Sequence, residues 1–309
     1  MMLERALELA ERGRGTTHPN PVVGAVVVAD GGIVGEGWHE RKGGPHAEVV
    51  ALEAAGERAR GATLYVTLEP CDHHGSQPPC TDAIVRAGVT KVVVGARDPT
   101  RDGVARLQEA GVEVDVLDLW EARVQNEAWL TWARLGRPFV TYKAAVTVDG
   151  RMAVPGERWV SGEESRKLVH ELRAASDAVA VGMGTVRADN PRLDAREVEV
   201  LRQPRRLAFG RGPLPQGSEL ELVSGALEEE LARLAGEGVQ SLLLEGGSTL
   251  ASSFFAADLV DKVLVFLAPK LAGEGPGLVA PLPKAVTLTH LTARAAGEDV
   301  LLAAYVHEP

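Results

Sequence analysis

The sequence predicts an α/β protein built from two layered domains, and three observations support this fold class. The chain has 309 residues, which is enough for two domains that each bury a core. Short apolar segments with strand character alternate with segments of helical periodicity along almost the whole chain. A helical pattern over 120–138, which stops at Gly136 and Pro138, separates two such series. We therefore expect one domain over 1–137 and a second over 138–309.

The first domain is expected to begin with a helix and to continue as strands and helices in turn. Leu3, Leu7 and Ala10 recur at helical spacing in a charged segment, which predicts an amphipathic helix. Asp30 and the two glycines after it predict a turn between the first two strands. Strands are expected over 21–29, 33–39, 63–70, 91–96 and the end of 106–117. Helices are expected over 46–59, 81–88, the start of 106–117, and 120–138. This order indicates a sheet covered by helices.

The second domain is expected to follow the same alternation. Its predicted strands cover 139–150, 177–183, 205–210, 240–247 and 262–271. Its predicted helices cover 163–175, 225–238 and 248–259. The segment 285–307 predicts a terminal hairpin, because two runs of strand character flank a glycine turn.

Composition narrows the classes of function. Apolar residues make up 45% and charged residues 25%, as in soluble globular proteins. The net charge of −10 disfavours non-specific nucleic-acid binding, which needs a basic surface. No apolar run is long enough to cross a membrane, and the charged N-terminal segment lacks the apolar core of a signal peptide. We expect a cytoplasmic protein without a nucleic-acid or membrane partner. We also expect it to form a homo-oligomer.

One group of residues has the composition of a metal site. His46, Ala47 and Glu48 open a predicted helix, Pro70 and Cys71 end a predicted strand, and Cys80 precedes another helix. A His-x-Glu motif followed by Pro-Cys and a second Cys is typical of zinc nucleobase deaminases. One imidazole and two thiolates would hold Zn²⁺ and leave a fourth position for water. Glu48 suits the proton transfers that such a reaction needs.

Non-catalytic interpretations of these residues remain open. The two cysteines, Cys71 and Cys80, could be buried thiols or a disulfide, although a disulfide is disfavoured in the cytosol. The zinc site could also be closed by a fourth protein ligand, for which Asp72, His73 and His74 are available. Two further histidines, His18 and His39, are expected to face the substrate or the surface.

Three segments around these residues resemble a known family. The segments 17–28, 37–48 and 67–88 resemble the deaminase domain of the bifunctional riboflavin-biosynthesis deaminase–reductases. The resemblance implies a cytidine-deaminase-like fold and hydrolytic deamination of 2,5-diamino-6-ribosylamino-pyrimidinone 5′-phosphate. It implies that His46, Cys71 and Cys80 are zinc ligands, that Glu48 is the general acid and base, and that Asn20 contacts the ring. An ordinary Asn-Pro turn is the alternative for Asn20.

Two features of this domain depart from the family. Asp72 stands where the family usually has a small hydroxyl residue. The loop after Pro99 is shorter than in the family, which puts its contacts with the ribose phosphate in doubt.

The second domain has a weaker signal of its own. Gly246 and Gly247 lead from a strand into a helix that starts near Ser248. Glycine permits close backbone approach, and a helix N-terminus offers free N–H groups to a phosphate. An ordinary strand-to-helix turn would look the same. The domain has no G-x-G-x-x-G motif, so a standard Rossmann site is not supported.

The resemblance to the family gives a more specific prediction for the second domain than the two glycines do. The segments 142–153, 159–193 and 242–250 resemble the family's reductase domain, which is similar to dihydrofolate reductase and uses NADPH to convert the ribosyl group to a ribityl chain. It implies cofactor contacts at Ala145, Trp159, Thr185, Asp189, Gly247, Ser248, Thr249, Leu250, Ala251, Ser252 and Ser253. It implies substrate contacts at Lys143, Arg173, Leu193, Arg196 and Glu245. The two arginines suit a phosphate, although each alone is more often a solvated charge.

The reductase half also departs from the family at two places. The segment that ends at Trp159 is one residue shorter, and a substrate-contacting serine is missing or replaced. After the strand 205–210 the family usually has Asp-Ser, whereas this chain has Gly210 and Arg211. We expect Arg211 to bind the 2′-phosphate of NADPH, because arginine grips phosphate through a planar fork of donors. A solvent-exposed loop arginine is the alternative.

Two rival functions are weighed against this assignment. A nucleic-acid deaminase shares the His-x-Glu and Pro-Cys motifs, but the acidic charge, the long spacing of the cysteines and the second domain disfavour it. A zinc-stabilised scaffold without catalysis would need a fourth protein ligand at the metal.

Overall fold

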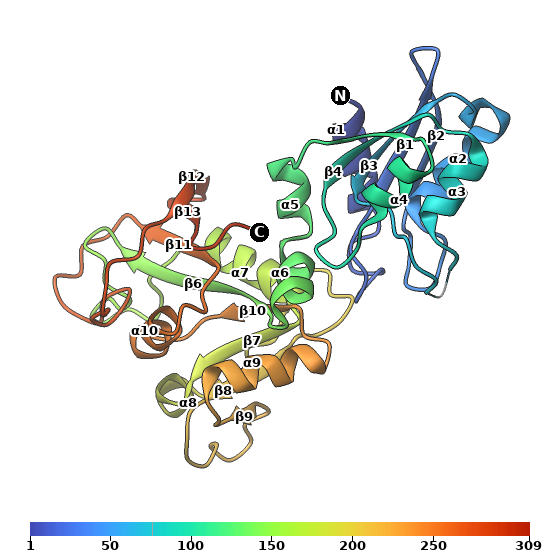
Figure 1. The fold of residues 1–309 in the computed structure, drawn as a ribbon. Helices are drawn as coiled ribbons and strands as arrows, with labels where there is room; N and C mark the ends of the chain where they lie inside the picture. Colours follow the sequence, from blue (N-terminus) through green and yellow to red (C-terminus); the bar gives the residue numbers. More distant parts are fainter. Residues whose placement is uncertain (76) are drawn as a thin grey trace. The chain divides into compact units, whose positions relative to one another are not determined.

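The computed structural model describes residues 1–75 and 77–309. The chain divides into two compact units, Met1–Leu135, with which Pro309 is grouped, and Gly136–Glu308. Each unit is an α/β layered structure (Figure 1), so the predicted fold class is confirmed.

The first unit is a five-stranded mixed sheet with the strand order β2-β1-β3-β4-β5. Its strands are β1 (Gly24–Ala29), β2 (Gly32–Trp38), β3 (Thr63–Leu68), β4 (Lys91–Ala96) and β5 (Glu113–Val116). Its helices are α1 (Met2–Glu11), α2 (Ala47–Ala55), η1 (Gly56–Ala59), α3 (Cys80–Ala87), α4 (Gly103–Glu109), α5 (Trp120–Gln125) and α6 (Glu127–Leu135). Strand β1 pairs antiparallel with β2 and β3, whereas β3, β4 and β5 run parallel.

Helix α2 lies very close to the sheet, and glycines make this possible. A Cβ atom added at Gly35 would overlap the carbonyl oxygen of Ala51, and one at Gly37 would overlap that of Ala47. The small residues of α2 therefore bury against β2, and the start of the helix is held over the sheet. This start carries the His46-Ala47-Glu48 motif.

The helical pattern over 120–138 forms two helices, so the prediction of one helix was wrong. Helix α5 ends at Gln125 and α6 begins at Glu127. Between them Asn126 is buried, and its side-chain amide accepts a hydrogen bond from the N–H of Val22 (3.0 Å) and donates one to the Val22 carbonyl (2.9 Å). Because these bonds need the side chain directed at Val22, they fix a break that the periodicity does not show.

The second unit is an eight-stranded sheet with the order β12-β13-β11-β6-β10-β7-β8-β9. Its strands are β6 (Phe139–Thr147), β7 (Ala178–Gly182), β8 (Arg205–Phe209), β9 (Glu221–Val223), β10 (Ser241–Leu244), β11 (Lys262–Ala268), β12 (Thr289–Ala296) and β13 (Asp299–Tyr305). Its helices are α7 (Glu163–Ala175), α8 (Met183–Asp189), α9 (Leu227–Gly236) and α10 (Ser248–Ala256). The strands from β11 to β9 in this order are parallel, and β12 and β13 form the predicted antiparallel hairpin.

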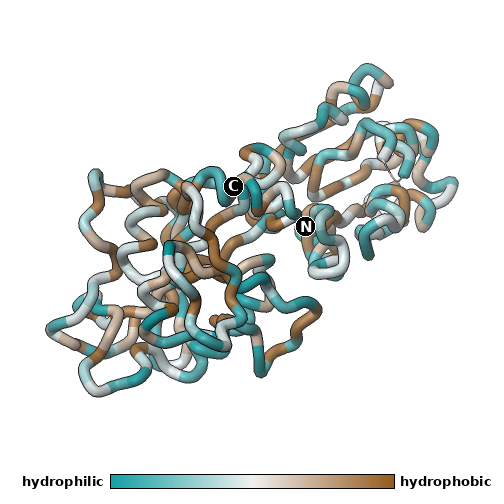
Figure 2. Tube along the Cα trace, turned by 90° about the horizontal axis from the view of Figure 1, so that it is seen from below, coloured by the Kyte–Doolittle hydropathy of each residue, from teal (hydrophilic) through white to brown (hydrophobic). Residues whose placement is uncertain are grey.

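Helices cover both faces of this sheet. On one face, Leu231 and Leu234 of α9 and Phe254 of α10 pack against strands β6, β7 and β8. On the other face, Val169 of α7 packs against Phe266 of β11. The strands of this sheet are therefore rich in buried apolar residues. Figure 2 shows brown apolar segments that alternate with hydrophilic ones along the trace.

Two short elements of the second unit were not predicted. Helix α8 begins directly where β7 ends, and β9 has three residues. In the first unit, α3 begins at Cys80 itself rather than after it.

A buried ion pair joins β6 and β11 at the end of the second sheet where these two strands begin. Asp261, just before β11, accepts two hydrogen bonds from Arg137 (both 2.7 Å) and one from the N–H of Val140 in β6 (2.8 Å). Its carboxylate also accepts from Nδ1 of His307, after β13 (3.1 Å). Burial opposes ionisation, but Arg137 and His307 outweigh it and hold the pKa of Asp261 below its usual value.

We expect Asp261→Asn to destabilise this unit by about 3 kcal/mol, because it leaves Arg137 without its buried counter-charge. The stabilisation by Asp261 should be complete above its unfolded-state pKa of about 4 and be lost as the pH falls through the lowered folded-state pKa. Hydrogen exchange of peptides covering β6 and β11 in the full chain measures this loss. The matched control is Asp258→Asn, whose carboxylate is 69% exposed. Equal protection in the two variants would contradict the prediction.

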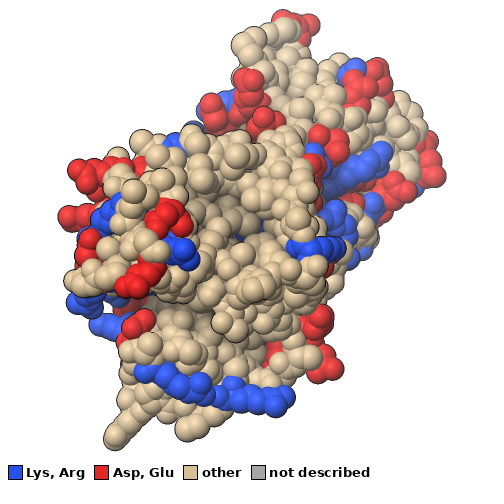
Figure 3. Space-filling view, turned by 90° about the vertical axis from the view of Figure 1, so that its left-hand side faces the viewer, with Lys and Arg blue, Asp and Glu red and all other residues tan. Residues whose placement is uncertain are grey.

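Charged side chains of both signs are dispersed over the face shown in Figure 3, with wide neutral areas between them. No helix of the described residues is long and apolar enough to cross a membrane.

Candidate active sites

Three elements of the first unit bring the predicted zinc ligands together. His46 is the residue before α2, Cys71 follows β3, and Cys80 is the first residue of α3. Nδ1 of His46 lies 3.1 Å from Sγ of Cys80 and 3.5 Å from Sγ of Cys71. The three ligand atoms lie within 4.8 Å of one another, so one ion could contact all of them. One imidazole nitrogen and two sulfurs suit Zn²⁺.

The local electrostatics favour a thiolate at this group. The thiol and N–H of Cys80, together with His46, hold the pKa of Cys71 at about 4. The hydrogen bond with Cys71 and burial raise the pKa of Cys80, so the pair shares one proton when no metal is bound. The hydrogen bond to Cys71 raises the pKa of His46. A metal ion would draw both sulfurs into the thiolate form.

Glu48 lies beside this group and is only 3% exposed. Burial raises the pKa of its carboxyl, while the neighbouring His46 opposes that shift. A carboxyl with a raised pKa can hold a proton as well as release one, which is the property of a general acid and base.

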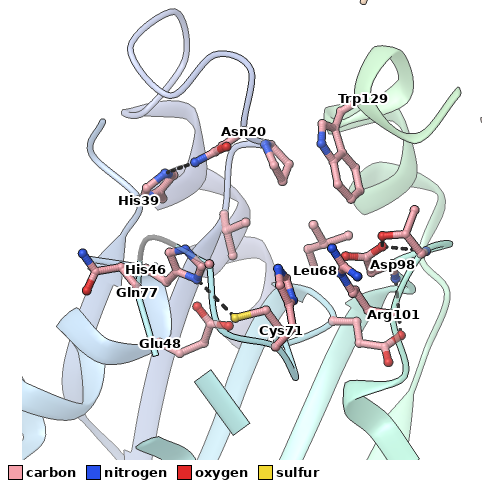
Figure 4. A pocket seen from close by; sticks show the side chains of 16 residues that line it. Asn20, His39, His46, Glu48, Leu68, Cys71, Gln77, Asp98, Arg101 and Trp129 are labelled. Atoms are coloured by element: carbon pink, nitrogen blue, oxygen red, sulfur yellow. Dashed lines mark hydrogen bonds between the residues drawn. The ribbon is translucent and has the colours of Figure 1, made fainter. Parts of the chain in front are cut away.

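A cavity of about 290 Å³ opens onto this group. Figure 4 shows His46, Glu48 and Cys71 on one side of it, with Asn20 and His39 above them. The carbonyl of Pro45 can only accept, so Nδ1 of His39 donates to it (3.0 Å). The other nitrogen, Nε2, then accepts from the amide nitrogen of Asn20 (3.1 Å). This chain of bonds orients the Asn20 side chain at the cavity wall.

The candidates for a fourth ligand stand apart from the group. Among the described residues, no further His, Cys, Asp or Glu joins the set of His46, Cys71 and Cys80. His73 lines the cavity, and its Nδ1 faces Asp72 at 3.8 Å, with 43% of the side chain exposed. Three protein ligands beside a buried carboxylate match an open, catalytic zinc site rather than a closed structural one.

In the second unit, the predicted substrate residues gather around one buried carboxylate. Glu245 follows β10 and accepts two hydrogen bonds from Arg173 of α7, at 2.6 and 3.0 Å. Nζ of Lys143 in β6 lies 3.3 Å from the same carboxylate. Burial opposes ionisation, but Lys143 and Arg173 prevail and lower the pKa of Glu245 to about 2. The three residues therefore form a charged cluster at the carboxyl end of the sheet.

The other two predicted substrate residues differ from each other. Arg196 is 46% exposed and pairs with Asp194 at 2.7 Å. The backbone carbonyl of Asp194 accepts from Arg173 (3.2 Å), which links the two arginines through one segment. Leu193 is 3% exposed, and its side chain belongs to the core. Its side chain is thus committed to packing, which leaves its backbone for any contact with a ligand.

The predicted cofactor segment 247–253 forms the start of α10, but its members have different environments. The hydroxyl of Ser252 donates to the carbonyl of Ala280 (3.0 Å), and that of Ser253 to the carbonyl of Thr249 (3.1 Å). Ala251 is fully buried. A Cβ added at Gly247 would lie 3.9 Å from the hydroxyl of Thr185, so α8 and α10 start side by side.

The remaining predicted cofactor residues lie on different elements. Ala145 is half-buried on β6, and Asp189 is exposed at the end of α8. Trp159 is 50% exposed, with Arg158 and Arg166 over its ring. Arg211 is exposed after β8, and its carbonyl accepts a hydrogen bond from Arg187 of α8 (2.7 Å).

Several cavity residues were not named from the sequence, although the resemblance implied that the loop after Pro99 borders the deaminase pocket. Trp129 of α6, Asp98, Thr100 and Arg101 line the cavity, and Figure 4 shows Trp129, Asp98 and Arg101 on the side away from His46 and Glu48. The sequence signal that could have found Asp98, Thr100 and Arg101 was the Asp98-Pro99 turn at the end of a buried strand, since side chains after parallel strands collect at one edge of a sheet.

Comparison with known proteins agrees with this architecture. Residues 1–96 match the family described as the cytidine and deoxycytidylate deaminase zinc-binding region, and residues 138–302 match the RibD C-terminal domain. Fold and sites together define a deaminase domain joined to a reductase domain.

Known relatives match most of this chain over most of their own length. The riboflavin biosynthesis protein RibD of Aquifex aeolicus is 42% identical over 88% of this chain and 87% of its own length, and that of Escherichia coli 40% over 91% and 90%. The chain belongs to the RibD family, the bifunctional deaminases and reductases of riboflavin biosynthesis.

Solved structures give the same result. The chain is similar to Acinetobacter baumannii RibD, with a TM-score of 0.86, 34% identity, and coverage of 98% of this chain and 97% of the other. It is also similar to a Thermotoga maritima diaminohydroxyphosphoribosylaminopyrimidine deaminase/5-amino-6-(5-phosphoribosylamino)uracil reductase, with a TM-score of 0.84, 35% identity, and coverage of 98% and 97%. The predicted order of a cytidine-deaminase-like domain followed by a reductase domain is confirmed.

Proposed function

We propose that the first unit removes the 2-amino group of 2,5-diamino-6-ribosylamino-pyrimidinone 5′-phosphate by hydrolysis, with zinc held by His46, Cys71 and Cys80. The observation that carries this proposal is the convergence of these three donors beside the buried Glu48 at the base of a cavity. When bound, zinc supplies the Lewis acidity that activates water near neutral pH.

The chain's own residues then handle the ring and the protons. Glu48 takes a proton from the attacking water and passes protons to the ring nitrogen and to the departing amino group, so that water and the amino group become a carbonyl and ammonia. Asn20 is oriented by His39 and offers its amide to the pyrimidine. Burial of the Glu48 carboxyl supports this role, because its raised pKa lets it alternate between the two protonation states.

We propose that the second unit uses NADPH to reduce the ribosyl group to ribityl. When bound, NADPH would supply the hydride for C1′; in the balanced reaction the bond from C1′ to the ring oxygen opens and that oxygen gains a proton. Lys143, Arg173 and Glu245 form the charged cluster beside which the substrate would bind. Ala145, Trp159, Thr185, Asp189 and the segment 247–253 would contact the cofactor.

The experiment that tests both halves supplies the diaminopyrimidinone ribotide to the zinc-loaded full chain, with and without NADPH. Ammonia release is expected in both cases. Loss of NADPH absorbance is expected after deamination, or at once when the aminouracil ribotide is supplied. Failure to release ammonia from the ribotide would overturn the deaminase assignment. Reduction that proceeds with NADH but not with NADPH would overturn the cofactor assignment.

Arg211 is the residue proposed to recognise the 2′-phosphate of NADPH. It follows β8 at the carboxyl edge of the parallel strands, where ligands bind in open α/β sheets. Gly210 before it has φ of +134°, a conformation that favours glycine at this turn. Arg187 donates to the Arg211 carbonyl and steadies the same turn.

We expect Arg211→Ala to weaken NADPH binding by about tenfold or more and to leave NADH binding nearly unchanged, because only NADPH carries the 2′-phosphate. Titration calorimetry with both cofactors measures this. The matched control is Arg294→Ala, an exposed arginine on β12. Equal effects on the two cofactors, or none on either, would favour the alternative of a solvated loop arginine.

The cytoplasmic location, the homo-oligomeric state and the absence of a nucleic-acid partner remain predictions from the sequence. Size-exclusion chromatography with light scattering would test the second of these.

A further inference from the structure

The zinc ligands of the deaminase cavity do not account for binding of the negatively charged phosphate of the proposed substrate. The proposed substrate carries a phosphate group, separated from the pyrimidine by a ribose. A phosphate dianion needs a cation or several N–H donors at its binding position. That position must lie away from His46 and Cys71, because the pyrimidine occupies that side.

Arg101 is the one lysine or arginine among the described residues that line this cavity. Figure 4 shows it on the side opposite His46 and Glu48, beside Asp98. No carboxylate of the described part of the chain lies within the 4.0 Å ion-pair distance of its guanidinium. Its charge is therefore available to a ligand, unlike that of Arg97 in the same loop, which faces Glu69 at 3.9 Å.

The nearby acidic residue is already engaged. Asp98 accepts hydrogen bonds from the N–H (2.8 Å) and the hydroxyl (2.7 Å) of Thr100. These bonds shape the turn between β4 and α4. Both bonds go to Oδ1 of Asp98, and no ion pair within 4.0 Å joins this carboxylate to the Arg101 guanidinium.

The loop that carries Arg101 is anchored at both ends by one buried carboxylate. Glu69 accepts from the N–H of Asp98 (3.3 Å) and from the N–H of Val104 (2.9 Å). Gly103 packs so closely on the carbonyl of Pro70 that a Cβ atom would overlap it. Pro70 is followed by the zinc ligand Cys71, so the arginine loop and the zinc group share one rigid segment.

We propose that Arg101 binds the 5′-phosphate of the deaminase substrate and thereby sets the preference of this domain for the nucleotide over the nucleoside. The inference rests on the proposed deaminase function. It assigns to this chain a phosphate contact in the loop whose length departs from the family.

The test compares Arg101→Gln with the unmodified chain on two substrates, the diaminopyrimidinone ribotide and the corresponding riboside without phosphate. We expect kcat/KM for the ribotide to fall about tenfold to a hundredfold, the scale of a charge-assisted hydrogen bond, and kcat/KM for the riboside to change less than about twofold. Arg101→Lys keeps the charge and should retain most of the preference.

The matched control is Arg106→Gln, whose side chain is 60% exposed on α4 and does not line the cavity. It should turn over both substrates normally. Binding provides a second measurement: in a Glu48→Gln background, which should not turn over, calorimetry should show weaker ribotide binding when Arg101→Gln is added. Inorganic phosphate should inhibit ribotide turnover by the unmodified chain and lose that effect in Arg101→Gln.

The outcomes separate the two proposals. No ammonia release from the ribotide by the unmodified, zinc-loaded chain would overturn both. Normal release by the unmodified chain, with equal losses on ribotide and riboside in Arg101→Gln and no rescue by Arg101→Lys, would overturn the role of Arg101 alone. Unchanged ribotide kinetics in Arg101→Gln would do the same.

Discussion

Replacing Glu48 by glutamine is expected to lower the deamination rate at least about a hundredfold while zinc stays bound. The amide has nearly the same shape as the carboxylate but cannot take the proton of water or return it to the ring nitrogen, and general acid–base groups contribute on this scale. Because Glu48 is buried next to the three ligands but is not one of them, the metal content should not change. Ammonia release and metal analysis by mass spectrometry measure the two quantities.

The control for this variant is Glu53→Gln, the same substitution at an exposed position of α2. It should behave as the unmodified chain. Reduction of supplied aminouracil ribotide should continue in both variants. If Glu48→Gln lost its zinc, Glu48 would be a ligand and the assigned role would be wrong.

Replacing Cys71 by alanine is expected to remove both the zinc and the deaminase reaction, while NADPH continues to bind. The variant leaves one imidazole and one thiol, too few donors for a stable zinc site. The second unit has its own sheet and its own core, and its candidate cofactor residues all lie within it. Zinc content and calorimetry with NADPH test the two statements on the same preparation.

Three substitutions serve as controls for the metal set. Asp72→Ala, His73→Ala and His74→Ala remove the candidates for a fourth ligand, and each should retain about one equivalent of zinc. Zinc loss in any of them would indicate a closed site and favour a structural metal. Loss of NADPH binding in a folded Cys71→Ala variant would show that the two units depend on each other.

Much of the fold could be predicted from the sequence, because strand and helix periodicities were strong in both halves. Helix α7 begins and ends at the predicted residues, and the terminal hairpin forms as expected. The break at Asn126 could not be predicted, since its cause is a pair of hydrogen bonds to Val22, about a hundred residues earlier in the chain. The strand β9, with three residues, is too short to leave a periodic signal.

The candidate sites divide in a similar way. The zinc ligands lie in short motifs whose His and Cys residues indicate metal binding, so the local sequence was enough to propose them. The opposite wall of the cavity combines Trp129 of α6 with Arg101 of another loop. Trp129 has no local pattern that distinguishes it from an ordinary helix side chain, and Arg101 has only the Asp98-Pro99 turn before it as a signal. Only the folded chain places the two residues at one cavity.

The buried contacts of Asp261 lie at the edge of the sheet where the parallel strands begin, whereas Glu245, Gly247 and Arg211 follow the ends of their strands. In this unit, the ion pair that stabilises the fold and the candidate ligand-binding residues thus lie at opposite ends of the parallel strands. A protein engineer who wishes to change the cofactor preference can therefore vary exposed positions after β8, such as Arg211, because the ion pair that holds the strands together lies outside the altered region. Glu245 after β10 should be kept, because it is the buried partner of Arg173 and Lys143. A library built in this way should lose few members to misfolding.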